Sequence, residues 1–173
     1  LFVALHACAT TALAQTVSLS PSFGRPAATI TVTGSGYVSG DSIVVSFDTD
    51  LACEATVELA GIFSCQIVVP LEAKPGPHQV IATRTSDSTT AAATFNVRTN
   101  MTQYLGGPRH LGFVRFENVL NESNIADVQP LWNVTFFPGF DFGQEGGSPV
   151  IAGERLFVGT SDGRLHSLWA KTG

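Results

Sequence analysis

The sequence predicts an all-β protein, and three observations lead to that class. Val, Ile, Thr and Phe are frequent, and Gly and Pro interrupt the chain every few residues. Apolar and polar residues alternate with a period of two in several short stretches, as in strands with one buried face. No long stretch after residue 15 has the 3.6-residue period of an amphipathic helix. With 44% hydrophobic and 13% charged residues, the 173-residue chain has enough apolar material for packed cores.

The alternating stretches between residues 16 and 98 predict an immunoglobulin-like β-sandwich. The pattern is clearest where Ile30 and Val32 alternate with threonines and where Phe95 and Val97 end the last stretch. About seven short strands in about 80 residues, with turn residues at regular spacing, are typical of that fold. The strands are expected near residues 17–20, 28–33, 42–47, 53–58, 62–69, 78–84 and 91–97.

Residues 1–15 are predicted to be the remainder of a secretory signal peptide. The stretch is apolar and rich in small residues, and Ala12-Leu13-Ala14 fits the A-x-A pattern before a signal-peptidase cut. Because the initiator Met and the positive n-region are missing, we expect the signal to begin upstream. A short membrane anchor or a buried helix is the alternative, although an anchor of about 20 apolar residues does not fit here. The protein is therefore expected to be secreted, periplasmic or attached to the cell surface.

Two cysteines are expected to form a disulfide. Cys53 and Cys65 flank a predicted hairpin that turns near residues 59–61, and cysteines on opposing strands of a hairpin can meet disulfide geometry. An exported chain passes through an oxidising compartment, which favours the bridge. Two buried free thiols are the alternative.

The first domain resembles the immunoglobulin-like modules of bacterial surface proteins. The resemblance rests on SLSPSFGRPAATITVTGSGY, on GIFSCQIVVP from Gly61 to Pro70, and on KPGPHQVIATR, which contains Pro75 to Val80. Modules of this kind serve as spacers or adhesion modules on exported proteins. The resemblance therefore implies a spacer or an adhesion module and transfers no catalytic residue.

The remainder of the chain resembles β-propellers built from pyrroloquinoline-quinone (PQQ)-like repeats. Residues 99–130 contain the phrase RHLGFVRFENVLNESNIADVQP, which is similar to the segment that enters such a propeller, and could include one helical turn capped by Ser123. Residues 131–173 would be the first PQQ-like blade, truncated at its end. Its strands are expected at 131–137, at 148–151, in LFVGT and in RLHSLW, with an Asp-Gly turn between the last two.

The repeat motif itself covers the stretch from Ser148 to the last residue. It departs from the family pattern at His166, Ser167 and Trp169, where Tyr, Ala and Asp are usual, and the loss of Asp puts in doubt the tethering of the final turn. The residues that carry the motif are Ser148, Pro149, Gly159, Asp162, Gly163, Thr172 and Gly173.

No catalytic, cofactor-binding or metal-binding residue is predicted. The sequence shows no Ser-His-Asp, Cys-His or paired-carboxylate arrangement. The loop carboxylates of Asp41, Asp48 and Asp50 could hold calcium, but solvated turn carboxylates are the expected interpretation. Trp132 and Trp169 could stack on a ligand, but packing within a blade is expected because each buries a large area.

These patterns lead to the hypothesis of a non-catalytic exported binding or scaffold protein. Its partner would be an unknown protein or glycan, and the remaining propeller blades would lie outside this chain. One alternative is a fragment of a PQQ-dependent dehydrogenase, for which PQQ and calcium would be the cofactors. A cell-surface adhesion or stalk protein is the other. Nucleic-acid binding is not expected, because the net charge is −5 and the sequence has no basic run.

Overall fold

The computed structural model describes residues 14–103, 105, 112, 114–136, 147–160 and 162–173. The expected all-β class is confirmed, because these residues form several β-sheets and only a short 3-10 helix. They divide into a first unit (residues 14–71 and 76–97) and a second unit (residues 72–75 and the described residues from 98 onward). In the described ranges, no helix has the length and apolar character needed to cross a membrane. Most of the predicted signal remnant lies outside the described residues.

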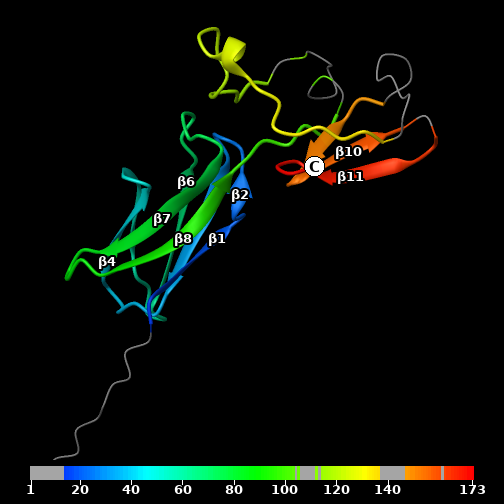
Figure 1. Ribbon diagram of the computed structural model, residues 1–173. Helices are drawn as coiled ribbons and strands as arrows, with labels where there is room; N and C mark the ends of the chain where they lie inside the picture. The colour runs from blue at the N-terminus through cyan, green and yellow to red at the C-terminus, as the bar shows by residue number, and fades with distance from the viewer. Residues whose placement is uncertain (1–13, 104, 106–111, 113, 137–146, 161) are drawn as a thin grey trace, which may run out of the picture. The chain divides into compact units, whose positions relative to one another are not determined.

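The first unit consists of two sheets (Figure 1). One has the order β1-β3-β6 and is antiparallel throughout. The other has the order β2-β8-β7-β4-β5, and only the pair of β2 and β8 is parallel. The strands are β1 (Thr16–Ser20), β2 (Phe23–Gly24), β3 (Thr29–Ser35), β4 (Ser42–Phe47), β5 (Asp50–Thr56), β6 (Ile62–Val68), β7 (Gly76–Arg84) and β8 (Thr90–Val97).

Alternating residues of both sheets build the core of the first unit. Ile30 and Val32 on β3 are 1% and 0% exposed, and the three threonines that alternate with them are exposed or half-buried. Gly34 lies opposite Phe63 in the ladder of β3 and β6, and an added Cβ would come within 2.0 Å of the phenyl ring. The strand therefore uses glycine here because the ring occupies the space of a side chain.

The Cys53–Cys65 disulfide is confirmed, but the hairpin expected around it is wrong. A tight turn does connect the two strands, with the Gly61 N–H donating to the carbonyl of Glu58. On either side of this turn the strands join different sheets. Strand β5 pairs with β4 in the five-stranded sheet, and β6 pairs with β3 in the three-stranded sheet. The disulfide, which spans 12 residues, therefore links the two sheets of the first unit.

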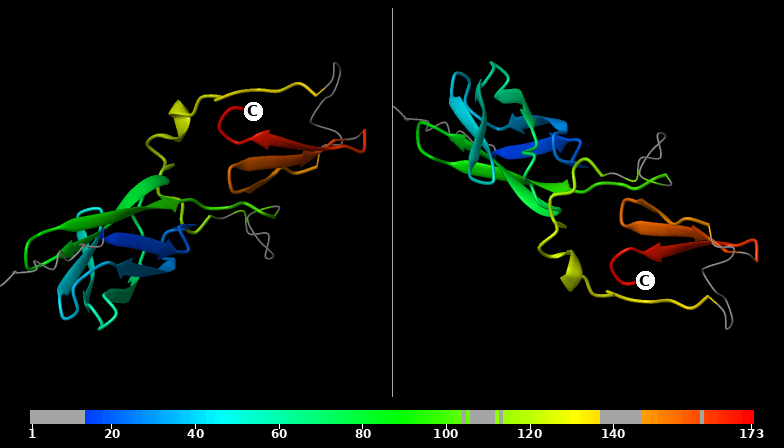
Figure 2. Two further views of the ribbon diagram at one scale, coloured as in Figure 1. Left: turned by 90° about the horizontal axis from the view of Figure 1, so that it is seen from below. Right: turned by 90° about the horizontal axis from the view of Figure 1, so that it is seen from above.

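The second unit is centred on an antiparallel sheet of the order β9-β10-β11, drawn in orange to red in Figures 1 and 2. Its strands are β9 (Val150–Ala152), β10 (Arg155–Gly159) and β11 (Leu165–Trp169). A turn at Gly153, whose φ is +63°, joins the first two, and the side chain of Asn100 accepts a hydrogen bond from its N–H at 2.9 Å. Met101 forms a single bridge with Ile151, so the chain just after the first unit lies beside β9.

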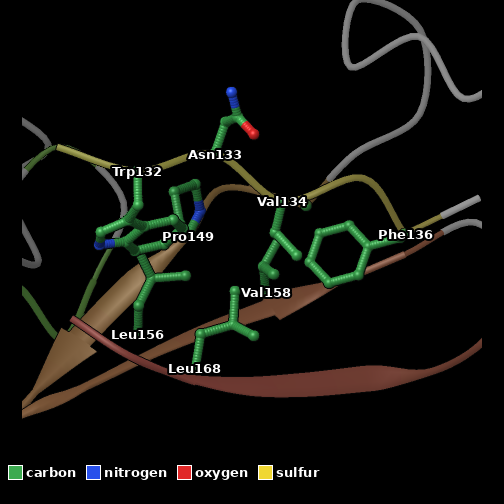
Figure 3. A pocket seen from close by; sticks show the side chains of 9 residues that line it. Trp132, Asn133, Val134, Phe136, Pro149, Leu156, Val158 and Leu168 are labelled. Carbon is green, nitrogen blue, oxygen red and sulfur yellow. The ribbon is translucent and has the colours of Figure 1, made fainter. Parts of the chain in front are cut away.

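The strand expected at 131–137 is not formed by its described residues. Residues 131–136 are extended but belong to no ladder, and Phe137 lies outside the described residues. The position beside β9 is held by Met101 instead. Residues 131–136 lie across one face of the sheet, where they act as a strap (Figure 3).

The expected helical turn exists, but Ser123 does not cap it. The structure has one turn of 3-10 helix, η2 (Ile125–Asp127), with Asn124 at the N-cap position. Ser123 instead donates from its N–H and its hydroxyl to the side-chain oxygen of Asn121. The backbone N–H of Asn121 in turn donates a hydrogen bond to the side-chain oxygen of Asn124 at 2.8 Å, which fixes the loop before the helical turn.

Candidate functional site

The turn between β10 and β11 is built around the carboxylate of Asp162. Its Oδ1 accepts hydrogen bonds from the Thr160 hydroxyl and from the Arg164 N–H, and its Oδ2 lies 3.3 Å from the Arg164 guanidinium. These contacts, the bond from Thr160 first, hold the pKa of Asp162 below its usual range. Gly163 takes a φ of +80°, a conformation that a tight turn demands and glycine adopts without strain. Asp162 and Gly163 are thus turn-forming residues.

His166 extends this hydrogen-bond network to the side chain of Phe136. Its Nε2 lies 3.2 Å from the Thr160 hydroxyl oxygen, and its ring centroid is 4.2 Å from that of Phe136. A nucleophilic hydroxyl would have to give its proton to the imidazole. Here the Thr160 hydroxyl donates to Asp162, so the histidine has no proton to accept from it. The arrangement braces the hairpin.

The same sheet face forms an apolar cavity of about 310 Å³ under the strap (Figure 3). Leu156 and Val158 from β10 and Leu168 from β11 form its floor, because alternate residues of paired strands share a face. The rest of the lining comes from the strap and from the segment that precedes β9: Trp132, Asn133, Val134, Phe136, Gly147 and Pro149. The labelled side chain of Asn133 points away from the cavity in Figure 3.

The final turn is tethered by the backbone, although the usual aspartate is absent. The N–H groups of Thr172 and Gly173 both donate to the carbonyl of Trp169, at 3.2 and 2.8 Å. Trp132 covers this turn: its Nε1–H donates to the carbonyl of Ala170 at 3.0 Å, and an added Cβ at Gly173 would lie 3.4 Å from its ring. The doubt raised by Trp169 in place of Asp is thus resolved by main-chain bonds and by Trp132.

The two tryptophans lie in different surroundings. Trp132 is half-buried at the cavity, whereas the Trp169 side chain is 47% exposed on the opposite face of the sheet. The guanidinium of Arg155 lies 3.7 Å from the centroid of the Trp169 ring, a cation–π contact. Both aromatic residues therefore make packing contacts, while Trp169 also leaves part of its surface to solvent.

Two of the three carboxylates considered for calcium, those of Asp41 and Asp48, have protein partners, and Asp50 is the first residue of β5. Asp48 accepts from the Gln79 N–H at 2.9 Å and pairs with His78 at 2.7 Å, and Arg84 pairs with Asp41 at 3.2 Å. The His78 ring also stacks on the ring of the buried residue Phe47, with the centroids 5.1 Å apart. The described residues contain no group of three or more His, Cys, Asp or Glu side chains placed to share a metal ion.

The structure places the motif residues in three groups, of which one is the pair Thr172 and Gly173 in the final turn after β11. Ser148 and Pro149 precede β9, with Pro149 at the cavity, whereas Gly159, Asp162 and Gly163 belong to the β10–β11 hairpin. Sequence reasoning missed the cavity itself. The signal for it was the alternation of Leu156 and Val158 next to a tryptophan-containing stretch, but alternation alone does not say what covers a sheet face.

Comparisons with known proteins assign no family. No family model matches the chain, and no curated protein matches it. Among solved structures the chain is similar to one titled macromomycin, with a TM-score of 0.40 and 18% sequence identity. That match covers 49% of this chain and 100% of the macromomycin chain.

Proposed function

We propose that the protein is a non-catalytic exported binding or scaffold protein. In this proposal the second unit is a blade of a PQQ-like β-propeller, and the first unit is an immunoglobulin-like spacer. The observation that carries it is the sheet of β9, β10 and β11, an antiparallel sheet whose turns hold Asp162, Gly163 and Gly173 of the repeat motif. A three-stranded sheet cannot bury both of its faces, so it needs neighbours such as further blades.

Export is supported by the disulfide between the sheets of the first unit. A Cys53–Cys65 bridge is compatible with an extracellular or periplasmic location, because disulfides persist in oxidising compartments. The non-catalytic character is supported by the Thr160 hydroxyl, which donates to a carboxylate that already serves the turn. A spacer role fits the pairing of Asp48 with His78 and of Asp41 with Arg84 in the first unit, which engages these charges within the unit.

The decisive experiment separates a binding protein from a quinone-dependent dehydrogenase. The purified full-length protein, with the blades that the proposal places outside this chain, is incubated with PQQ and calcium, and dye reduction is measured with alcohols and sugars as donors. We expect no bound quinone after gel filtration and no dye reduction. Stoichiometric PQQ binding with donor-dependent dye reduction would overturn the proposal in favour of the dehydrogenase.

A second experiment assigns binding to one of the two units. The whole chain and a variant without residues 16–98 are compared on glycan arrays and on immobilised exported proteins. The proposal expects both to bind the same partner, since the propeller is the platform. If only the whole chain binds, the first unit is the binding module and the protein is an adhesion or stalk protein.

A further inference from the structure

The cavity under the strap is large enough for a small molecule. Its volume of about 310 Å³ is roughly twice that of an engineered protein cavity of about 150 Å³ that binds benzene. It also lies at the lower end of the range of about 300–1,000 Å³ for ligand sites. A compound with two fused or linked rings therefore matches this space better than a single ring or an extended polymer.

The lining determines the chemistry of such a ligand. None of the described residues that line the cavity carries a charge, and its floor is formed by Leu156, Val158 and Leu168. The one indole N–H in the lining, from Trp132, already donates to Ala170. An ion would lose its hydration without gaining a partner, so charged ligands are excluded by their desolvation cost.

Aromatic rings stand at both ends of the strap. Trp132 is held by its bond to Ala170, and Phe136 by its ring contact with His166, while Val134 lies between them. Anchors at both ends hold the strap over the sheet without the ladder bonds of a strand, which leaves space beneath its middle. Flat rings between two aromatic side chains gain offset-stacked or edge-to-face contacts in addition to burial.

We propose that this cavity is a binding site for an uncharged aromatic compound of about two rings. The inference goes beyond the proposed scaffold function and does not depend on it, because all the lining residues belong to the second unit of this chain. Binding is governed by shape and burial, and a sulfonate or carboxylate on the same rings weakens it strongly.

The test uses 1-naphthylamine with the whole chain at pH 7, a fluorescent probe of two fused rings that is neutral at this pH. The Trp169→Phe variant leaves Trp132 as the sole tryptophan, so quenching of its emission reports on the cavity. We expect saturable probe binding with quenching of Trp132, and at least tenfold weaker binding of 1-naphthalenesulfonate. Absence of saturable binding, or equal binding of the sulfonate, would overturn the proposal.

Two matched variants of the hairpin locate the site. Val158→Phe fills the cavity from β10, whereas Leu165→Phe adds the same ring at an exposed position on the other face of the sheet. We expect at least a tenfold loss of probe affinity in Val158→Phe and less than a twofold change in Leu165→Phe. A smaller insertion, Val158→Leu, provides the same test if the phenylalanine variant does not fold, as judged by circular dichroism. Equal affinity of all folded variants places the probe elsewhere and refutes the site.

Discussion

The two units of this chain bury their apolar residues to very different degrees. In the first unit, long side chains such as Phe63, Phe95 and Ile43 are at most 1% exposed. Among the described residues of the second unit, the buried apolar residues are Val158 and Ala73, which are 5% and 7% exposed. The difference follows from architecture, since two sheets can cover each other's apolar faces and one small sheet cannot. The first unit therefore has a hydrophobic core of its own. The second unit depends more on single contacts, such as the hydrogen bond from Trp132 to Ala170.

The stability against unfolding can be measured separately for each unit. Both tryptophans of the chain, Trp132 and Trp169, belong to the second unit, so tryptophan fluorescence follows that unit alone. The strands of the first unit dominate the far-ultraviolet circular dichroism. The following predictions begin with the largest expected effect.

Truncation of a buried aromatic side chain should give the largest difference in stability loss between the two units. Phe63→Ala is expected to destabilise the first unit by about 3–5 kcal/mol, because it removes a ring that is 1% exposed and leaves a cavity. The matched change Phe157→Ala, at a half-buried position of β10, should cost the second unit about 1 kcal/mol or less. Guanidinium unfolding with both signals measures the two values, and similar losses would contradict the contrast.

Removal of the disulfide should affect the first unit alone. The double variant Cys53→Ala with Cys65→Ala is expected to lose roughly 2–3 kcal/mol, because the bridge closes a loop that spans 12 residues. The tryptophan transition of the second unit should stay where it is. Reduced wild-type protein serves as the control, and a stability equal to that of the oxidised form would show that the bridge contributes nothing.

Removal of one buried hydroxyl should increase the stability of the first unit. The buried Tyr37 hydroxyl has no hydrogen-bond partner among the residues that the structure describes, while its ring packs edge-on against Phe63 with the ring centroids 5.2 Å apart. Tyr37→Phe keeps this ring contact and removes the desolvated group, so we expect a gain of about 1 kcal/mol. Chemical unfolding followed by circular dichroism measures it, and a clear loss of stability would mean that the hydroxyl is satisfied in solution.

Replacement of Trp132 should loosen the second unit without affecting the first. Trp132→Phe keeps an aromatic ring over the final turn but removes the donor to Ala170, at a cost of about 1 kcal/mol. The emission of Trp169 reports the shift in the unfolding midpoint. The first unit is the internal control, and an unchanged midpoint in the second would show that the strap is held by other contacts.

The smallest effect concerns acid stability of the first unit. Burial pushes the pKa of Asp48 upward, but the hydrogen bonds from His78 and the Gln79 N–H outweigh it and place that pKa below its usual range. Because the folded pKa is depressed, the stabilisation is present above about pH 4, the ordinary aspartate value, and is lost as the pH falls through the folded value.

The variant Asp48→Asn tests this pH dependence. The pair is partly exposed, so its contribution should stay below about 1 kcal/mol. Stability measured from pH 6 to pH 2 should fall less steeply in the variant than in wild type. Identical pH profiles of the variant and the wild type would show that Asp48 does not contribute to the acid stability of the first unit.

Much of the first unit could be predicted from the sequence, because period-2 alternation specifies a strand and its buried face. Ile30 and Val32 are an example. The missed strand, Phe23–Gly24, has two residues and is too short to show a period. The assignment of β5 and β6 to different sheets was also missed, since a tight turn and two cysteines are compatible with a hairpin as well as with a crossing between sheets.

The second unit was harder to predict for a physical reason. Apolar residues of an extended segment can pair at a sheet edge or pack across a sheet face, and LWNVTFF fits both patterns. Contacts between residues distant in sequence decide that this segment packs across the sheet face. They are the bridge from Met101 to β9 and the hydrogen bond from Trp132 to Ala170. The cavity depends on the same contacts, so no local pattern could have revealed it.

The strict alternation of faces in β10 and β11 restricts how this protein can evolve. Inserting a single residue before Leu156 or Val158 would exchange the cavity floor with the face that carries Arg155. Substitutions can accumulate singly in these strands, but changes in length are tolerated only where the ladder is interrupted. Among natural variants of this chain, insertions and deletions should therefore concentrate at the turns near Gly153 and Gly163.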